Sequence, residues 1–154
     1  MRGAATRKDP HGFDDALRIA ARRKRVPHEF VLDAISVLSP RTRAMFGCIA
    51  VYVGGRIVLI LRDKPGADAD NGVWLATTVQ HHDSLRREFP QMRSIGVLGK
   101  AVTGWQLLPA ADANFEQAAL QACALIRQGD PRIGKVPQPR APRRAQTKPQ
   151  RGRR

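Results

Sequence analysis

The chain has 154 residues and 42% of them are apolar, which suffices for the core of one domain but not for two. Two cysteines are too few for a disulfide-stapled scaffold, and no apolar run reaches the about 20 residues that span a bilayer. The first residues lack the apolar stretch of a secretory signal peptide, so we expect a cytoplasmic protein. A formal net charge of +14 favours anionic partners.

The basic residues concentrate at the two ends of the chain. Residues 1–26 carry eight Lys or Arg against three Asp, residues 27–131 carry ten against ten acids, and residues 132–154 carry nine with no acid. This distribution predicts a neutral domain over 27–131 between two basic arms. A folded nucleic-acid-binding surface more often carries its excess charge inside the domain, so any affinity for polyanions is expected in the arms.

The two arms are predicted to lack stable structure. Residues 132–154 have regular prolines and almost no apolar side chains, so burial cannot offset the entropy of ordering them, and we expect a disordered tail. In residues 1–26, a weak apolar stripe over 14–25 allows a helix with basic residues at its end. The N-terminal arm is therefore expected to be disordered or a fraying helix.

The C-terminal arm supplies the candidate nucleic-acid contacts. The side chains that could each approach a phosphate are Arg140, Arg143, Arg144, Lys148, Arg151, Arg153 and Arg154. If about five of them contacted duplex DNA, log affinity would fall with log salt at a slope near −4.5. Such binding would be non-specific, because the sequence indicates neither a reading helix nor base-stacking aromatic residues. The alternative is a tail that only aids solubility or contacts acidic surfaces casually.

The first predicted element is a helix that starts at Pro27 and stops before Pro40, since proline suits a first turn but breaks a helix interior. Two β-rich runs follow over 48–53 and 56–61. Two glycines join them and supply the positive φ angles of a two-residue hairpin turn. This hairpin is the strongest local signal in the chain.

The hairpin turn predicts the register of its strands. It pairs Val53 with Arg56, Tyr52 with Ile57, and so on outward. Strict alternation then gives one face with Cys48, Ala50, Tyr52, Ile57, Leu59 and Leu61, and the other with Ile49, Val51, Val53, Val58 and Ile60. Because both faces are apolar, we expect these strands to be central and covered on both sides by helices or by a partner.

The later elements complete an α+β pattern. They are a strand over 73–77, a helix capped by Thr77 or Thr78 and continuing through Phe89, two short strands over 93–98 and 104–108, and a helix over 115–126. The last helix is the clearest, because its apolar residues share one face and Gly129 follows as a C-cap before Pro131. The predicted order is α-βββ-α-ββ-α.

A short motif surrounds the first hairpin. It consists of Arg43, Met45, Phe46, Gly47, Tyr52, Gly55 and Arg56. The motif resembles the opening hairpin of the N-terminal domain of the TfoX (Sxy) family of bacterial competence regulators, and the resemblance covers roughly residues 27–129. It implies a two-layer fold with an antiparallel five-stranded sheet and helices on one side, similar to the secretion-chaperone-like class.

The motif residues are expected to have folding roles. Gly47 would let the backbone bend or approach a neighbour closely, while Met45 and Phe46 would plug the sheet against the first helix. The chain departs from the family in three places: Cys48 replaces a glycine, residues 74–77 replace the usual third-strand pattern, and a basic tail stands where TfoX has a C-terminal helical domain. Regulation of competence is therefore not implied, and the resemblance carries no catalytic residues.

Three groups of residues could suggest chemistry, and each has a simpler explanation. His81 and His82 point about 100° apart on a helix, so they fit a solvated helix start better than one metal ion. Cys48 and Cys123 lie in apolar patterns and are predicted to be buried thiols with a raised pKa rather than a redox pair. The stretch 96–100 lacks the Ser or Thr of a phosphate loop and predicts a hairpin turn. We therefore expect no enzymatic activity, no metal and no cofactor.

The sequence thus predicts a non-enzymatic binding or regulatory module that recognises a protein partner or forms a homodimer. The reason is that helices on one side of a two-layer fold would leave one apolar face of the hairpin uncovered. The alternative is a nucleic-acid-associated protein whose basic tails hold the phosphate backbone non-specifically. Neither a membrane nor a small-molecule substrate is expected.

Overall fold

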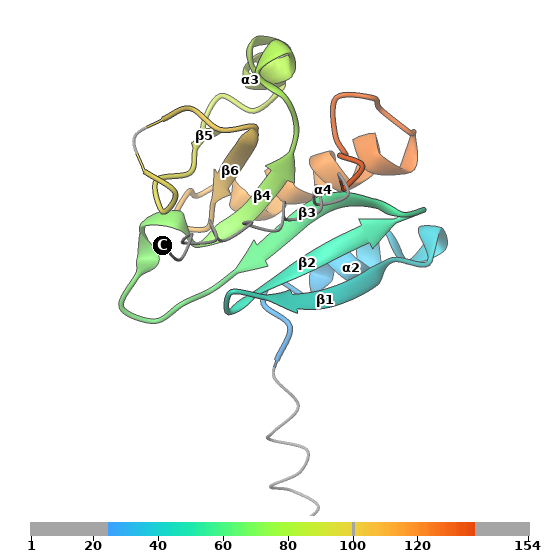
Figure 1. Ribbon diagram of the computed structural model, residues 1–154, viewed down its shortest axis with the longest axis horizontal. Coiled ribbons are helices and arrows are strands. Elements are labelled where there is room, and N and C mark those ends of the chain that lie inside the picture. The colour runs from blue at the N-terminus through green and yellow to red at the C-terminus, as the bar shows by residue number, and fades with distance from the viewer. Residues whose placement is uncertain (1–24, 100, 138–154) are drawn as a thin grey trace, which may run out of the picture.

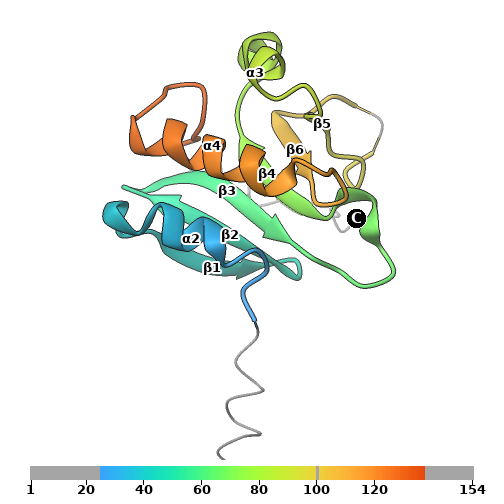
Figure 2. The same ribbon diagram turned by 180° about the vertical axis from the view of Figure 1, so that it is seen from behind.

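The computed structural model describes residues 25–99 and 101–137, which form an antiparallel six-stranded sheet with helices on one side (Figure 1, and from the opposite side Figure 2). The strands lie in the order β1-β2-β3-β4-β6-β5. In chain order they are β1 (Arg41–Met45), β2 (Cys48–Val53), β3 (Arg56–Arg62), β4 (Gly72–Ala76), β5 (Arg93–Ser94) and β6 (Trp105–Pro109). The helices are α2 (Phe30–Ala34), α3 (His82–Glu88) and α4 (Phe115–Arg127), with 3₁₀ turns η1 (Ser36–Leu38), η2 (Asp68–Asp70) and η3 (Val79–His81). The predicted α+β class is confirmed.

Two sequence predictions fall largely outside the described residues. The helix considered over 14–25 lies there apart from its last residue, and so do the seven cations proposed as phosphate contacts between residues 140 and 154. In the described part of the chain, no helix is long and apolar enough to cross a membrane.

The sheet has six strands, and the prediction of five was wrong. The additional strand is β1, whose mostly exposed residues lack the apolar alternation that marks a strand in sequence. It forms because Phe46 and Gly47, with φ angles of 51° and 73°, make a two-residue turn in which Met45 pairs with Cys48. At the other edge, the strand predicted over 93–98 is reduced to the two residues of β5.

The β2–β3 hairpin has the predicted glycine turn but a different register beyond it. The pairs next to the turn are as expected, whereas Val51 pairs with Leu59. Val58 is thus an extra residue on β3, a β-bulge. The bulge places Leu59 and Leu61 on the helix side of the sheet and Ile60 on the opposite side, so the faces predicted for these three residues were wrong.

Two helices begin or end differently from the sequence pattern. Helix α2 stops at Ala34, and the 3₁₀ turn η1 carries the chain on to Leu38. The segment predicted to start at Thr77 or Thr78 opens as η3 and becomes α-helical only at His82, and Thr78 makes no side-chain capping bond there. Each segment still packs against the sheet through its apolar residues, Val31 and Ile35 in the first and Leu85 and Phe89 in the second. Burial of an apolar face, rather than capping, supplies most of the stability of short helices in proteins.

Helix α4 and its C-terminus agree with the sequence pattern. Its buried residues belong to the helix-side core, and Gly129 has a φ angle of 71°. The N–H groups of Gly129 and Asp130 donate to the carbonyl oxygens of Ile126 and Leu125, each at 3.0 Å. These bonds cap the last carbonyls of the helix as the predicted C-terminal glycine requires.

Apolar side chains pack on both sides of the sheet, but only one side has helices. Figure 2 shows α2 and α4 lying across that side, and Figure 1 shows the strands from the other. We call the second side the helix-free face. Its strand residues are Arg41, Arg43, Met45, Cys48, Ala50, Tyr52, Ile57, Ile60, Arg62, Trp74, Ala76, Arg93, Trp105 and Leu107.

The roles expected for Met45 and Phe46 were wrong. Met45 packs on the helix-free face, and the ring of Phe46 is 88% exposed on the β1–β2 turn. Neither side chain plugs the sheet against α2. The first helix instead contributes Val31 and Ile35, both fully buried, to the helix-side core.

The domain continues past residue 131, where the basic tail was predicted to begin. Ile133 is buried in the helix-side core, and Lys135 exchanges two backbone hydrogen bonds of 2.9 Å with Ile57. Gly134 lies between them and donates to the carbonyl oxygen of Ala76 at 2.7 Å. Because β4 ends at Ala76, Ile57 needs another backbone partner, and the C-terminal segment supplies it. The segment thereby crosses from the helix side to the helix-free face.

Candidate functional site

The charged side chains that strands direct to the helix-free face are all basic. The register of the sheet places Arg41, Arg43, Arg62 and Arg93 there, and none of the strand residues on this face is Asp or Glu. The acidic residues of the described segments lie on helices and connecting loops instead. The domain is balanced in charge as a whole, whereas the charged strand positions of this face carry cations alone.

Two of these arginines are engaged within the protein and two are not. Arg62 is buried and donates from one nitrogen to two acceptors in the β3–β4 loop, both at 2.9 Å. Arg93 pairs with Asp70 at 3.1 Å. Arg41 and Arg43 are exposed on the edge strand β1, and neither has an ion pair within residues 25–99 and 101–137. These two guanidinium groups are available to an external anion.

Asp70 organises the loop beside the face. In addition to its arginine partner, its carboxylate accepts hydrogen bonds from the N–H groups of Gly96 and Val97 at 2.9 and 2.8 Å. Its carbonyl oxygen accepts from the indole N–H of Trp74 at 2.8 Å. These bonds hold the β5–β6 loop next to the sheet, where Val97 and Leu98 remain 51% and 63% exposed.

Aromatic residues from distant positions gather on the helix-free face. Tyr52, Trp74 and Trp105 are the chain's one tyrosine and its two tryptophans, and Phe46 stands on the turn at their edge. The two indole rings pack edge to face, with centroids 6.3 Å apart. Trp74 is buried, whereas Tyr52 and Trp105 are half-buried. The sequence interpretation missed this group of aromatics because its members are far apart along the chain.

An apolar groove of about 310 Å³ lies beside these rings. It is lined by Met45, Phe46, Cys48, Ile60, Arg62, Lys64, Trp74, Val97, Leu98 and Trp105. Phe46 and Leu98 are its most exposed side chains. Its volume is at the lower end of the roughly 300–1,000 Å³ typical of ligand sites.

The β1–β2 turn holds Lys64 at the rim of the groove. The Lys64 ammonium donates to the carbonyl oxygen of Phe46 at 2.8 Å. Gly47 leaves room for this approach, because a Cβ atom there would lie 2.8 Å from Cε of the lysine and would displace the end of that side chain. The φ angle of 73° at Gly47 also favours glycine. The motif therefore positions an exposed ring and a cation side by side.

Two other motif residues act at the β2–β3 turn. Gly55 supplies a φ angle of 79°. Arg56 donates from Nη2 to the carbonyl oxygen of Gly134 at 3.1 Å, which fastens the C-terminal segment to the sheet. Both residues are thus structural and lie apart from the groove.

Lys135 brings a further cation to the helix-free face. Its Nζ atom lies 5.4 Å from the centroid of the Trp105 ring, and burial lowers the pKa of its ammonium group. The described chain ends two residues later at Pro137. The residues that carry the seven predicted phosphate contacts therefore follow, in sequence, from a point close to this face.

His82 is buried, so the solvated helix start predicted for this residue was wrong. Burial lowers the pKa of His82, and a hydrogen bond with the backbone of Gly104 opposes this effect. Its Nε2 atom has no hydrogen-bond partner in the described structure. Residues 25–99 and 101–137 also contain no cluster of three potential metal ligands. Burial therefore favours the neutral form of the His82 side chain, which lies near the C-terminal segment.

The two cysteines lie on opposite sides of the sheet. Cys48 faces the helix-free side and Cys123 belongs to the helix-side core, and both are buried and free. Burial raises the pKa of the Cys123 thiol to about 11, which confirms the predicted inert thiol at that position. Because the sheet separates the two sulfur atoms, they cannot form a redox pair.

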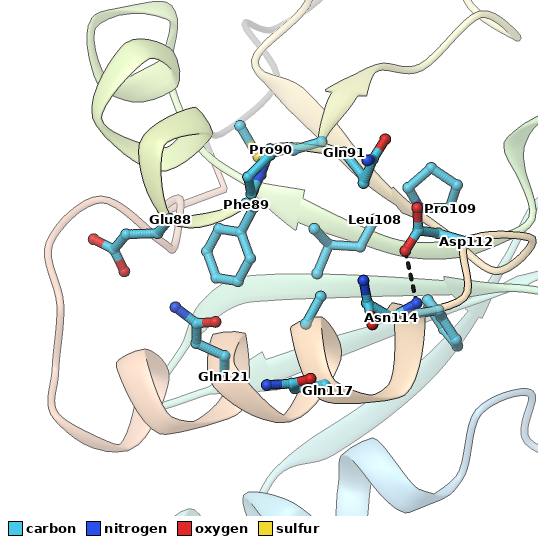
Figure 3. Close-up of a pocket in the computed structure, with 13 residues that line it drawn as sticks. Glu88, Phe89, Pro90, Gln91, Leu108, Pro109, Asp112, Asn114, Gln117 and Gln121 are labelled. Atoms are coloured by element: carbon cyan, nitrogen blue, oxygen red, sulfur yellow. Dashed lines mark hydrogen bonds between the residues drawn. The ribbon is translucent and has the colours of Figure 1, made fainter.

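A second pocket, of about 260 Å³, lies on the helix side between the α3–β5 connection and α4 (Figure 3). Its carboxylates are engaged: Asp112 accepts from the backbone N–H of Asn114 at 2.8 Å, and Glu88 pairs with Arg132 at 2.6 Å. The amide side chains around it come from Gln91, Asn114, Gln117 and Gln121. This lining presents no nucleophile beside a base, so the helix-free face is the stronger candidate site.

Comparisons with protein-family models, with curated proteins and with solved structures find no match to this chain. The resemblance to TfoX stays a prediction from the motif residues between Arg43 and Arg56. Function is therefore argued from the site itself.

Proposed function

We propose that the protein is a non-enzymatic binding module that holds the phosphate backbone of a nucleic acid on its helix-free face. The observation that carries the proposal is a pair of exposed cations: β1 directs Arg41 and Arg43 to a face on which every charged strand residue is basic. Lys64 adds positive charge next to the aromatic residues of the same face. Cations interspersed with aromatic rings suit a chain of phosphates and bases.

The basic C-terminal arm supports the same kind of partner. Lys135 has reached the helix-free face just before the arm begins. Residues 138–154 contain seven Lys or Arg and no acid. A polyanion bound on the face would lie close to the start of this arm, so face and arm would add their phosphate contacts.

The groove favours binding over catalysis. General acid–base chemistry needs a group that titrates near the working pH within reach of a substrate. The groove lining contains neither a histidine nor a carboxylate. Its charged members are Arg62, which is engaged, and Lys64, which is bound to the turn.

An acidic protein segment is the second candidate partner. It is favoured by the apolar groove, where Phe46 and Leu98 expose surface that a docked segment would bury. A second copy of the chain fits this face poorly, because self-docking would bring Arg41 and Arg43 against the same positive surface. The competitor to a nucleic acid here is therefore an acidic peptide.

The proposal includes the finer expectations from the sequence. A secretion-chaperone-like arrangement of a TfoX-type domain is supported by the antiparallel sheet with helices on one side. A cytoplasmic location is part of the same proposal, since intracellular nucleic acids would be its partners.

Random-sequence oligonucleotides, in single- and double-stranded form, test the proposal on the full chain. Both tryptophans lie on the helix-free face, so intrinsic fluorescence reports binding there. We expect Arg41→Gln/Arg43→Gln to weaken binding and to reduce the salt slope of log affinity by about one for each charge removed. The matched control, Arg86→Gln/Arg87→Gln on α3, removes the same charge from another surface.

The outcomes separate the candidates. A larger loss in the β1 variant than in the α3 variant supports the helix-free face as the site. Equal losses would mean that binding follows net charge alone, which overturns the proposal. Tighter binding of a polyglutamate peptide than of either oligonucleotide would replace it with the second candidate.

A further inference from the structure

We infer that the helix-free face is built for unpaired bases, so that single-stranded nucleic acid binds it in preference to duplex. This inference rests on the proposed function and names the form of the partner. It is carried by Phe46, an exposed aromatic ring on a turn beside an apolar groove and the cation of Lys64.

Folding alone does not explain a phenylalanine at position 46. The ring is 88% exposed and so contributes little to the core. Its φ angle of 51° lies in the left-handed region, where Gly, Asn and Asp are favoured over bulky side chains. An Asn-Gly pair would form this two-residue turn more readily. A bulky residue at a position whose backbone disfavours it points to a contact with a ligand.

The surroundings of Phe46 suit a planar aromatic ligand. The groove next to it is lined by apolar and aromatic side chains, among them Ile60, Trp74 and Trp105 from the sheet, and Leu98 from the β5–β6 loop adds a further apolar side chain. A base stacked on the Phe46 ring could extend over this groove. Aromatic stacking of this kind accepts any base, because every base has a π-face.

A row of cations runs along the edge strand next to this ring. Arg41 and Arg43 point to the same face of β1. Their Cα atoms are about 7 Å apart, as expected for residues two apart on a strand. Lys64 continues the row at the β1–β2 turn. A nucleic-acid strand whose phosphates followed these cations would direct its bases inward, toward Phe46 and the groove.

Duplex DNA fits the same face less well. Its bases are stacked inside the helix, and they are read by an α-helix or a two-stranded ribbon placed in the major groove. Helices α2 and α4 lie behind the sheet as seen from this face, and α3 stands beyond the end of β4 (Figure 1), so the face itself presents strands and no helix to a groove. Open sheet faces with aromatic side chains bind splayed single strands instead.

Fluorescence titration of the full chain tests the inference with a labelled random-sequence single strand of about 12 nucleotides, within the length that sheet-based sites cover, and with the matching duplex. We expect tighter binding of the single strand, together with quenching of the tryptophans. Phe46→Asn, which suits the left-handed turn, should lower single-strand affinity about fivefold or more and leave duplex affinity unchanged. Leu120→Ala, which trims an exposed apolar side chain on α4, is the matched control and should change neither.

Each result decides the inference. Equal affinity for the two strand forms, or a Phe46→Asn variant that binds the single strand like the parent chain, overturns it. If the arginine variant of β1 still weakens both forms in that case, the proposed function stands and only the preference for unpaired bases fails. Circular dichroism of each variant verifies that its fold is kept.

Discussion

Lys135 lies over the indole ring of Trp105, with its Nζ atom 5.4 Å from the ring centroid. The contact joins β6 to a C-terminal segment that also pairs with Ile57 on β3. A cation over a tryptophan contributes about 0.5–1 kcal/mol at an exposed site and more when water is excluded. The segment after α4 is thereby part of the domain, and it brings Lys135 to the helix-free face.

Ile133→Ala tests whether the C-terminal segment stabilises the domain. Ile133 is 4% exposed and belongs to the helix-side core, so its truncation should lower the free energy of unfolding by about 2–4 kcal/mol. The control is Val136→Ala, three residues later, where the side chain is 69% exposed and the change should stay within about 0.5 kcal/mol. Urea denaturation measures both. Equal stability of the two variants would show that the segment is not docked in solution.

His82 should make stability depend on pH near neutrality. Burial holds its pKa below 6.5 in the folded chain, so the folded state binds fewer protons than the unfolded state as the pH falls through 6.5. The free energy of unfolding should therefore decrease below pH 6.5, by up to about 1.4 kcal/mol per pH unit until the folded-state pKa is reached. Above that window His82 contributes no pH dependence.

The neighbouring histidine provides the control for this effect. His82→Gln should flatten the pH dependence just below 6.5, whereas His81→Gln, at a half-buried position, should retain it. Thermal or urea denaturation at several pH values on either side of 6.5 measures the difference. If the free energy of unfolding had the same pH dependence in both variants, the pKa of His82 would not be lowered in the folded state.

Gly47→Ala and Gly55→Ala separate turn strain from the positioning of Lys64. Both glycines have positive φ angles, 73° and 79°, so each alanine should cost about 1–2 kcal/mol of stability. Only at Gly47 would the new Cβ meet a neighbour, Cε of Lys64 at 2.8 Å, whereas nothing lies within 4 Å at Gly55. We expect similar melting temperatures for the two variants but weaker single-strand binding for Gly47→Ala alone. Equal affinities would remove Lys64 from the proposed site.

Local signals predicted the parts of the fold that depend on a few consecutive residues. The two glycines after Val53 specified a hairpin turn because few other residues accept two positive φ angles. Gly129 ended α4 for the same reason. The bulge at Val58 escaped prediction, because its neighbours are apolar on both faces and alternation alone cannot tell which register packs better.

The candidate site was less accessible to sequence reasoning than the fold. Tyr52, Trp74 and Trp105 become neighbours only when β2, β4 and β6 enter one sheet. The sequence marked Arg43 only as a residue of the hairpin motif and did not mark Arg41, and it is the pairing of β1 with β2 that turns both to the same face. The basic patch was therefore sought in the arms, although the domain also carries one.

The amino-acid sequence by itself determined that this chain forms one α+β domain with basic ends, because composition, glycine turns and helix periodicity act over a few residues at a time. Only the tertiary structure decided that β1 joins the sheet, that Ile133 is buried, and that aromatic rings share a face with exposed arginines. These features depend on strand order and register, which result from contacts between distant segments competing for the same core.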